Sequence, residues 1–267
     1  MSTTALITGG SSGLGFEFAR QLGANGYDII LVARNKGKLD KAAGDLVKQG
    51  ITVVAYAGDI TDDTRLTAIA KKIKATGTTI DFLVLNAGVV TPKLLTGFKD
   101  AAELKHDLNI NLWGTILSAQ IFLPMVNRGG KVLMISSAFG LMAPAAYSVY
   151  TASKAGVINF AESVRRELLC KQISVHVACP ADIDTPQLHE EHKNMPDWFK
   201  DNDPRTAISP ALAARKILKK CDKKTFIIII QFEIHMLNLM NKLLPRRMRD
   251  FFLDRMFPVP GESDYDY

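Results

Sequence analysis

A tyrosine and a lysine, Tyr150 and Lys154, are the residues of this sequence whose types and spacing best suit proton transfer. Side chains four positions apart share one face of a helix, and we predict a helix that begins at this pair and runs to residue 169. A free phenol has a pKa of about 10 and is a poor acid at neutral pH. Because a nearby cation favours the phenolate, we expect Lys154 to lower the pKa of Tyr150.

A tyrosine four residues before a lysine is a common pattern in proteins. Other polar residues of this sequence make the pair informative. Ser137 lies at the end of one predicted strand, and Asn86-Ala87-Gly88 follows another. A further amide, Asn111, lies in the helical stretch between them. Ligands of an open α/β sheet bind outside the carboxyl ends of its strands. We therefore expect Ser137 and Asn86 to meet Tyr150 at one edge of a sheet.

A glycine-rich loop follows the first predicted strand and opens a helix. Its sequence is Thr8-Gly9-Gly10-Ser11-Ser12-Gly13-Leu14-Gly15. Glycines let the backbone approach a pyrophosphate, whose charge meets the free N–H groups at a helix N-terminus. We predict that Gly9, Ser11, Ser12, Gly13, Leu14 and Gly15 bind the phosphates of a dinucleotide. The alternative is a tight turn between strand and helix that holds no ligand.

The end of the second predicted strand indicates which dinucleotide would bind. The chain there reads Val32-Ala33-Arg34-Asn35. Folds that prefer NAD place an acidic side chain near this point for the ribose 2′-hydroxyl, whereas arginine accommodates a 2′-phosphate. A guanidinium can bind phosphate with two hydrogen bonds. Arg34 therefore predicts NADP(H), and the alternative is a solvated arginine at the start of a helix.

Short apolar runs alternate with helical patterns along most of the chain. This order implies βαβ units and a parallel sheet covered on both faces. We predict an α/β fold, a Rossmann-type doubly wound parallel sheet of about seven strands with helices on both faces. The predicted strands are residues 5–8, 28–33, 52–57, 82–85, 131–136, 174–178 and 226–230, and the predicted helices are residues 14–22, 39–48, 66–74, 101–126, 152–169 and 211–220.

The chain changes character after residue 230. We divide it into a dinucleotide-binding catalytic domain, 1–230, and an amphipathic helical extension, 231–267. Apolar residues of the extension recur with helical spacing, and arginines and phenylalanines follow them. We expect residues 232–257 to guide an acyl chain and to make a peripheral membrane contact. The alternative is that the stripe Ile234, Leu237, Met240 and Leu244 covers the sheet or a partner subunit.

Composition narrows the classes of partner that the protein could bind. The net charge of +6 and the pI near 9.1 suit a phosphate-bearing cofactor, an anionic membrane or nucleic acid. The first 220 residues contain no basic run with interleaved aromatics, so we expect no nucleic-acid partner. Polar residues interrupt the longest apolar tract, 226–244, which argues against a membrane span.

The cysteines and the N-terminus indicate the cellular compartment of the protein. Cys170, Cys179 and Cys221 are widely spaced and odd in number. They are typical of reduced thiols and of neither a disulfide framework nor a metal site. The first strand begins almost at once and leaves no room for a signal peptide. We expect a cytoplasmic protein without a bound metal, with the extension in peripheral contact with the cytoplasmic face of a membrane.

The order and spacing of these motifs resemble the short-chain dehydrogenase/reductase family over residues 3 to about 230. The resemblance implies that Tyr150 protonates a carbonyl oxygen as hydride leaves the nicotinamide. It implies that Lys154 binds the nicotinamide ribose and lowers the tyrosine pKa, and that Ser137 binds the substrate oxygen. Asn111 would hold a water that relays protons, and Asp59-Ile60 resembles the family's adenine-contacting dipeptide. The family is usually dimeric or tetrameric, which implies a homodimer or homotetramer.

The sequence departs from the family pattern at two positions. Leu85 stands where an asparagine usually precedes the Asn-Ala-Gly motif, which removes one side-chain hydrogen bond. Pro180-Ala181 replaces the usual Pro-Gly, and the alanine restricts the loop near the nicotinamide amide. Pro180, Ile183 and Thr185 could still contact the cofactor.

The second departure points to a substrate. The loop Pro180-Ala181-Asp182-Ile183-Asp184-Thr185-Pro186 resembles that of 3-ketodihydrosphingosine reductases, which also carry a hydrophobic, basic C-terminal extension. This resemblance implies an NADPH-dependent reduction of a lipid-like ketone, 3-ketosphinganine, to sphinganine. Reduction of a 3-oxoacyl or steroid-type ketone remains an alternative. From another class, a nucleotide-binding protein that has lost turnover is also an alternative, because fold alone does not decide function.

Overall fold

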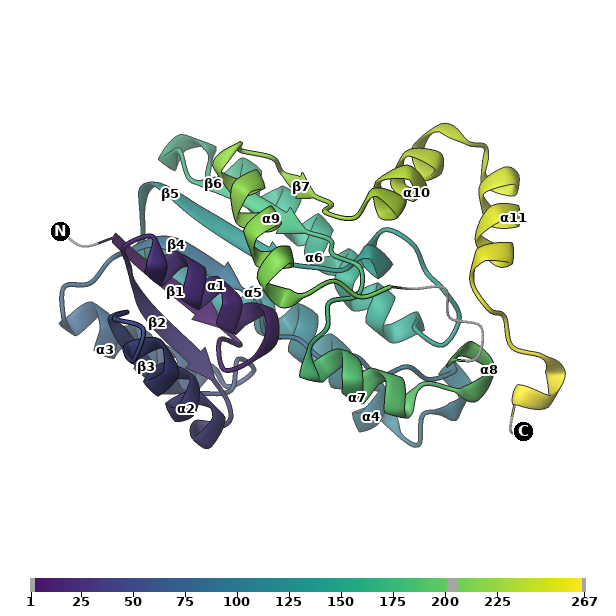
Figure 1. The fold of residues 1–267 in the computed structure, drawn as a ribbon, viewed down its shortest axis with the longest axis horizontal. Helices are drawn as coiled ribbons and strands as arrows, with labels where there is room; N and C mark the ends of the chain where they lie inside the picture. Colours follow the sequence, from purple (N-terminus) through teal and green to yellow (C-terminus); the bar gives the residue numbers. More distant parts are fainter. Residues whose placement is uncertain (1–2, 201–205, 266–267) are drawn as a thin grey trace.

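A computed structural model describes residues 3–200 and 206–265. The predicted domain 1–230 and extension 231–267 each include a few residues outside that part. Within it, seven parallel strands form one sheet in the order β3-β2-β1-β4-β5-β6-β7 (Figure 1). The strands are β1 (Thr3–Thr8), β2 (Tyr27–Ala33), β3 (Val53–Ala57), β4 (Ile80–Leu85), β5 (Val126–Ile135), β6 (Ser174–Ala178) and β7 (Ile227–Ile228). This confirms the predicted doubly wound parallel sheet.

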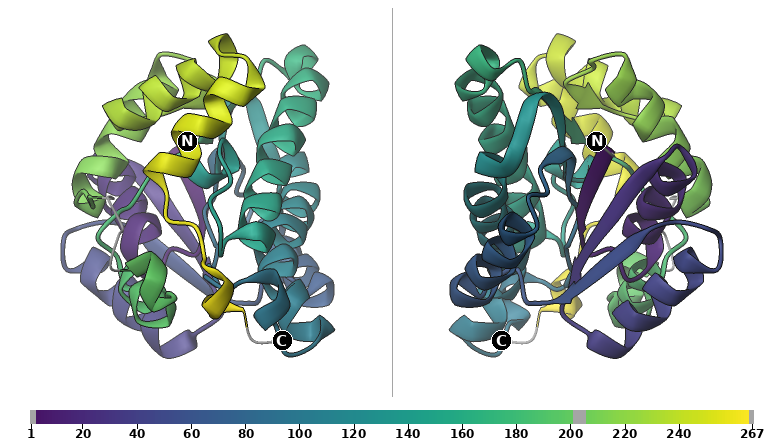
Figure 2. Two further views of the ribbon diagram at one scale, coloured as in Figure 1. Left: turned by 90° about the vertical axis from the view of Figure 1, so that its right-hand side faces the viewer. Right: turned by 90° about the vertical axis from the view of Figure 1, so that its left-hand side faces the viewer.

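Helices cover both faces of the sheet, as Figure 2 shows edge-on. The described α-helices are α1 (Gly13–Ala24), α2 (Lys36–Val47), α3 (Asp63–Ala75), α4 (Ala101–Asp107), α5 (Gly114–Phe122), α6 (Ser148–Glu167), α7 (Pro186–Asn194), α8 (Asp197–Lys200), α9 (Pro210–Asp222), α10 (Phe232–Leu243) and α11 (Arg246–Met256). Helices α1, α2 and α9 contribute to one hydrophobic cluster, and α3, α5 and α6 to another.

The central strands bury both of their faces between these clusters. Successive side chains of a strand point to opposite sides of a sheet. In β1, Ala5 and Ile7 belong to one cluster and Leu6 to the other, and all three are fully buried. This two-sided burial explains why the strands read as continuous apolar runs in the sequence.

The strand order reverses at β1. The chain runs outward from β1 to β2 and β3, and then returns to place β4 on the other side of β1. A crevice forms at such a point, outside the carboxyl ends of the strands. In Figure 1 the arrowheads of β1, β2 and β4 point toward the side of the molecule where α7 lies. The fold therefore places the predicted motifs at the carboxyl edge of the sheet, near α7.

The prediction of a single helix over residues 101–126 is wrong. A π-helical turn, Leu108–Trp113, separates α4 from α5, and β5 already begins at Val126. Two buried polar side chains explain the interruption. Asp107 accepts hydrogen bonds from the N–H and hydroxyl of Thr91, and Asn111 is held by Val89. Buried polar groups need such partners, and the helical pattern alone does not reveal them.

Helices α7 and α8 were not predicted, and the last strand is shorter than predicted. Thr185 caps α7, accepting a hydrogen bond from the N–H of Leu188 at 3.3 Å, and Pro186 takes the first helical position. A Thr-Pro pair of this kind is a recognised signal for a helix start. The seventh strand comprises Ile227–Ile228 and not the five residues predicted.

The extension packs against the carboxyl edge of the sheet, shown in yellow-green and yellow in Figure 1. Ile234 and Leu237 of α10 are buried in a core cluster, and Met240 packs against it. The predicted stripe therefore faces the protein, which favours the alternative that it covers the fold. No described helix is long and apolar enough to cross a membrane.

Candidate active site

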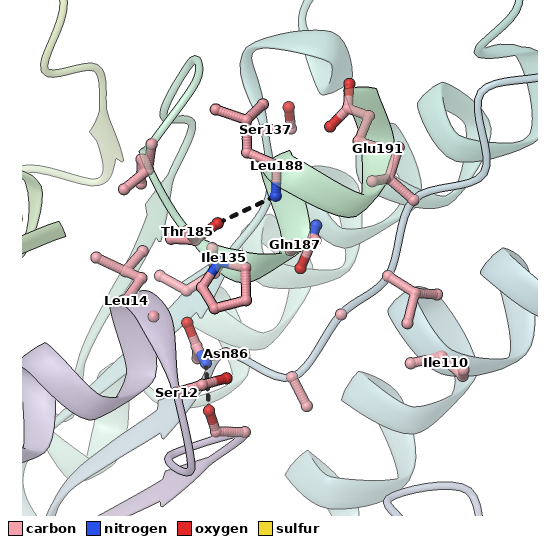
Figure 3. A pocket seen from close by; sticks show the side chains of 18 of the residues that line it. Ser12, Leu14, Asn86, Ile110, Ile135, Ser137, Thr185, Gln187, Leu188 and Glu191 are labelled. Atoms are coloured by element: carbon pink, nitrogen blue, oxygen red, sulfur yellow. Dashed lines mark hydrogen bonds between the residues drawn. The ribbon is translucent and has the colours of Figure 1, made fainter. Parts of the chain in front are cut away.

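A crevice of about 830 Å³ runs along the carboxyl ends of the strands. It gathers the predicted site residues that lie far apart in the sequence. Of these residues, all except Gly15 and Asn111 line it, namely Gly9, Ser11, Ser12, Gly13, Leu14, Arg34, Asp59, Ile60, Asn86, Ala87, Gly88, Ser137, Tyr150, Lys154, Pro180, Ile183 and Thr185. Figure 3 shows Ser12 and Asn86 toward one end of this crevice and Glu191 toward the other.

The glycine loop has the close packing that a pyrophosphate site requires. Gly9 has a φ of +68°, a conformation that side chains disfavour, and its N–H donates to the carbonyl oxygen of Val32 at 2.8 Å. A Cβ added to Gly15 would lie 2.4 Å from the carbonyl oxygen of Gly9. Gly15 thus lies behind the loop and lets α1 approach it. The N-terminus of α1 then presents its first-turn N–H groups, which favour an anion.

Asn86 supports this loop from the end of β4. Its side-chain amide donates to the carbonyl oxygens of Thr8 and Gly9, both at 3.2 Å. Its backbone N–H donates to the hydroxyl of Thr8 at 3.0 Å. Asn86 therefore holds the strand end and the glycine loop together.

Arg34 lies at the rim of the crevice, at the start of α2. Its side chain is 72% exposed, and one guanidinium nitrogen lies 3.9 Å from a carboxylate oxygen of Asp59. Lys38, one turn along α2, also lines the crevice and was not predicted. Two cations close to the first turn of a helix form a site suited to a phosphate. The sequence signal for Lys38 was a basic residue four positions after Arg34.

Ser137, Tyr150 and Lys154 all line the crevice. Ser137 follows β5, and its hydroxyl accepts a hydrogen bond from the N–H of Phe139 at 3.1 Å. It also lies within hydrogen-bonding reach of the phenol of Tyr150, which stands in the first turn of α6. These hydroxyl groups can together face one carbonyl oxygen of a ligand.

The expected effect of Lys154 on Tyr150 is not found. Burial raises the pKa of the Tyr150 phenol, and the hydrogen bond with Ser137 opposes that rise. The charges of Glu191, Asp107 and Asp182 raise the pKa further. The lysine nitrogen lies 5.7 Å from the centre of the tyrosine ring. Burial and these carboxylate charges therefore determine the direction in which the pKa of Tyr150 is shifted.

Lys154 is buried and lines the crevice. Its ammonium donates to the carbonyl oxygen of Ile135 at 3.2 Å. Burial lowers the pKa of Lys154 to about 8, and the charge of Asp107 opposes this. A Cβ on Gly88 would lie 3.1 Å from both the lysine nitrogen and the amide oxygen of Asn111. Gly88 thus leaves the space in which these two polar groups approach each other.

Asn111 is fixed by several hydrogen bonds in the π-helical turn. Its amide oxygen accepts from the N–H of Val89 at 2.8 Å. Its amide nitrogen donates to the carbonyl oxygen of Val89 at 2.9 Å and to the hydroxyl of Ser153 at 3.0 Å. Both amide hydrogens are therefore engaged within the protein, which positions Asn111 firmly beside the crevice residues.

The loop after β6 closes one side of the crevice. The carbonyl oxygen of Pro180 accepts from the N–H of Ala138 at 2.8 Å. The N–H of Ala181 donates to the side chain of Gln231 at 3.2 Å, which links this loop to the start of the extension. A Cβ on Gly13 would lie 3.1 Å from the Thr185 methyl group, so the loop also contacts the glycine loop.

Several lining residues escaped the sequence analysis. They are mostly apolar and include Phe139, Leu188, Ile234 and Phe257. Ile234 and Phe257 belong to the extension, and both are buried. The helical stripe of the extension was the signal for Ile234, although its destination in the crevice could not be predicted from spacing.

Known proteins share this sequence pattern and this fold. A family model described as short chain dehydrogenase matches residues 3–196. A 3-dehydrosphinganine reductase of Arabidopsis thaliana is 31% identical over 202 residues, which cover 73% of this chain. The match covers 60% of that reductase, so this chain spans about 60% of its length. A 3-oxoacyl-acyl-carrier-protein reductase of Chlamydia trachomatis is 31% identical over 205 residues, covering 75% of this chain and 82% of that protein.

A solved structure extends the likeness to nearly the whole fold. It is a short chain dehydrogenase/reductase from Burkholderia phymatum in complex with NAD. The two chains superpose with a TM-score of 0.80 over 97% of each chain, at 20% sequence identity. At that identity the likeness concerns the fold alone.

Proposed function

Because the chain belongs to the short chain dehydrogenase family, which consists of oxidoreductases, we propose that it reduces a lipid-like ketone with NADPH. The substrate that we propose is 3-ketosphinganine, which would be reduced to sphinganine. The observation that carries this proposal is that Ser137, Tyr150 and Lys154 line one crevice together with the glycine loop and several apolar side chains. The matches to 3-dehydrosphinganine reductases support the choice of substrate.

The proposed mechanism assigns one role to each polar side chain. NADPH, when bound, supplies the hydride that reaches the carbonyl carbon. Tyr150 donates its phenol proton to the carbonyl oxygen, which completes the alcohol. Ser137 binds the same oxygen and orients it, and Lys154 binds the ribose hydroxyls of the cofactor. The role of Asn111, to hold a water that returns a proton, would fall to an oxygen atom of that residue, because both of its amide hydrogens are engaged within the protein.

The cofactor preference that we propose rests on the end of β2. The residues there supply Arg34, and Lys38 stands one turn further on at the same crevice. A 2′-phosphate would lie between two cations and the N-terminus of α2, whereas a 2′-hydroxyl would gain little from them. Asp59 and Ile60, which follow β3, would contact the adenine.

An apolar wall supports a substrate with a long hydrocarbon chain. Leu188 of α7, Ile234 of α10 and Phe257 after α11 are all buried and line the crevice. Apolar side chains favour hydrocarbon over water because burial removes apolar surface from solvent. Reduction of a 3-oxoacyl chain is the second candidate, which the match to the 3-oxoacyl-acyl-carrier-protein reductase supports.

Oxidation of NADPH by purified protein tests this proposal. The assay compares 3-ketosphinganine in detergent micelles with a 3-oxoacyl thioester and a steroid ketone. We expect the highest kcat/KM with 3-ketosphinganine and formation of sphinganine, identified by mass spectrometry. A higher value for the thioester would favour the second candidate. If the protein reduces none of these ketones, the result would favour the alternative of a catalytically silent nucleotide-binding protein.

We also propose that the extension contacts a membrane through apolar side chains of α10 and α11 that the protein leaves exposed, among them Phe251 and Phe252 of the predicted basic segment. We define the exposed apolar face of α10 and α11 as Phe232, Met236, Leu239, Leu243, Met248, Phe251, Phe252 and Met256, each at least 39% exposed. Helix α11 also carries four arginines against two aspartates. Exposed apolar and basic side chains on one helix suit an anionic lipid surface. The resemblance to the family supports, in addition, a homodimer or homotetramer.

Co-sedimentation with anionic vesicles tests the membrane contact. The protein should sediment with the vesicles and be released by high salt, because salt screens exposed charges. Replacing Arg246, Arg247 and Arg249 with glutamate should abolish sedimentation. The same charge change at Lys71, Lys72 and Lys74, exposed on α3, should leave it intact. Sedimentation that is equal for both triple variants, or absent in the unaltered protein, would refute the contact.

A further inference from the structure

Phe257, the residue that follows α11, lines two hollows of the protein. The first is the crevice of about 830 Å³ that Ser137 and Tyr150 also line. The second has a volume of about 50 Å³ and is lined by Met142, Ala143, Pro144, Ala145, Leu253, Asp254, Phe257, Pro258 and Val259. Ligand sites usually measure about 300–1,000 Å³, so the second hollow is too small to be a site by itself. A residue that lines both hollows forms a wall that they share.

Two contacts hold the ring of Phe257 in this wall. The ring packs edge-on against Phe139, with ring centres 5.9 Å apart and an interplanar angle of 80°. Phe139 lines the crevice and lies two residues after Ser137. The backbone N–H of Phe257 donates to the carbonyl oxygen of Leu253 at 2.9 Å, in the last turn of α11. Phe257 is 9% exposed, so the wall is a buried one.

A hydrogen bond ties the extension to the same loop of the protein. The side-chain amide of Asn241, on α10, donates to the carbonyl oxygen of Leu141 at 3.1 Å. Leu141 directly precedes Met142, which is buried and lines the second hollow. The extension thus contacts the loop after β5 through α10 and again through Phe257. Side chains locked by packing and hydrogen bonds keep their positions, so a ligand that reaches Phe257 meets a fixed ring.

The spaces on both sides of this ring suit hydrocarbon. On the crevice side, Leu188 and Ile234 are buried and apolar. Beyond the ring, the side chains that line the second hollow are apolar except for Asp254. The crevice has to hold a dinucleotide as well as a ketone, which leaves a long hydrocarbon chain only the apolar part of it. The end of such a chain would therefore reach Phe257.

We infer that Phe257 sets the longest hydrocarbon chain that the crevice accepts, by closing the second hollow off from it. The second hollow is then a continuation of the chain site that the ring blocks. A smaller side chain at position 257 joins the two spaces and admits a longer chain. This inference rests on the proposed ketone reduction and adds the residue that selects substrates by length.

The test measures kcat/KM for 3-ketosphinganine homologues whose chains differ by two carbons at a time. Each is kept below the concentration at which it forms micelles. In the unaltered protein, kcat/KM should rise by about fourfold per methylene, the scale of one buried CH₂, up to a limiting length. For a chain two carbons beyond that limit, Phe257→Ala should raise kcat/KM by about 10- to 20-fold, the gain from burying two methylenes. Chains shorter than the limit should change much less.

Two control variants separate a length limit from a general loss of packing. Phe98→Ala removes the same ring from a residue outside both linings, where the ring faces the ammonium of Lys93, and it should leave the limit unchanged. Ala145→Leu fills part of the second hollow. Alone it should also leave the limit unchanged, because the ring of Phe257 still closes the hollow. Combined with Phe257→Ala, it should cancel the gain for the longer chain.

A Phe257 that is only structural would give a different result. Phe257→Ala would then lower kcat/KM by the same factor for every chain length, and this outcome would overturn the inference while leaving the reductase intact. Phe257→Leu keeps a buried apolar side chain, and it should shift the limit in the same direction if the alanine variant does not fold.

Binding distinguishes failure of this inference from failure of the proposed function. Turnover of no ketone by the unaltered protein would contradict the proposed function itself. The length limit can still be measured by equilibrium dialysis of straight-chain fatty alcohols. Their affinity should increase up to a limiting length, and Phe257→Ala should move that length upward. The same limiting length in both proteins would count against the inference.

Discussion

Replacing Tyr150 with phenylalanine is expected to slow ketone reduction by about 10²–10⁴-fold, the usual cost of removing a general acid. The substitution deletes one hydroxyl and keeps the ring that packs 6.2 Å from that of Tyr147. Folding and NADPH binding should therefore survive. Steady-state NADPH oxidation measures the first effect, and quenching of protein fluorescence by NADPH measures the second.

A matched substitution shows whether the loss is specific. Tyr27→Phe removes a hydroxyl at the start of β2, where the ring packs against Phe82 and lies outside the crevice lining. We expect its turnover to remain within about twofold of the unaltered protein, because surface changes away from the site have small effects. A Tyr150→Phe variant with a near-normal rate would remove Tyr150 from the mechanism.

The raised pKa of Tyr150 is compatible with reduction. A proton donor must carry its proton before the reaction, and burial together with the nearby carboxylates keeps the phenol protonated at neutral pH. Oxidation of an alcohol would need the phenolate, which these same influences disfavour.

The fold could be predicted because its signals are local. The central strands bury both faces and read as apolar runs, and their ends agree with the structure within two residues for β1, β4 and β6. The break between α4 and α5 could not be predicted in this way. It depends on Asp107 and Asn111 meeting Thr91 and Val89 after the chain has folded.

Some residues of the candidate site could also be predicted from local sequence, and others could not. The glycine loop and the Tyr150–Lys154 pair are short motifs, and the sequence places the loop at a strand end and the pair at the start of a helix. The wall of the crevice comes instead from segments distant in sequence, such as Glu191, which bonds Tyr147 across 44 positions. The stripe of α10 showed that a helix was amphipathic, but spacing alone could not tell which of its two apolar faces would be buried.

Removing the guanidinium of Arg34 is the second change with a large expected effect. We expect NADPH to bind the unaltered protein more tightly than NADH. Arg34→Ala should weaken NADPH binding by roughly 1.5–3 kcal/mol, the scale of a charged hydrogen bond, and should change NADH binding little. The lower part of that range suits a side chain that is 72% exposed, because solvent screens its charge.

A second arginine nearby provides the control for this prediction. The guanidinium of Arg65 donates to the carbonyl oxygen of Ala57 at 2.7 Å, close to the same sheet edge, but Arg65 does not belong to the crevice lining. Arg65→Ala removes the same charge and should leave the ratio of NADPH to NADH affinity unchanged, whereas Lys38→Ala should lower it. Titration of each variant with both cofactors, at low and at high salt, measures these ratios. Equal affinity for NADPH and NADH in the unaltered protein would contradict the assignment of Arg34 and Lys38 to phosphate binding. The 2′-phosphate is the group by which the two cofactors differ, so cations that bind it must favour NADPH.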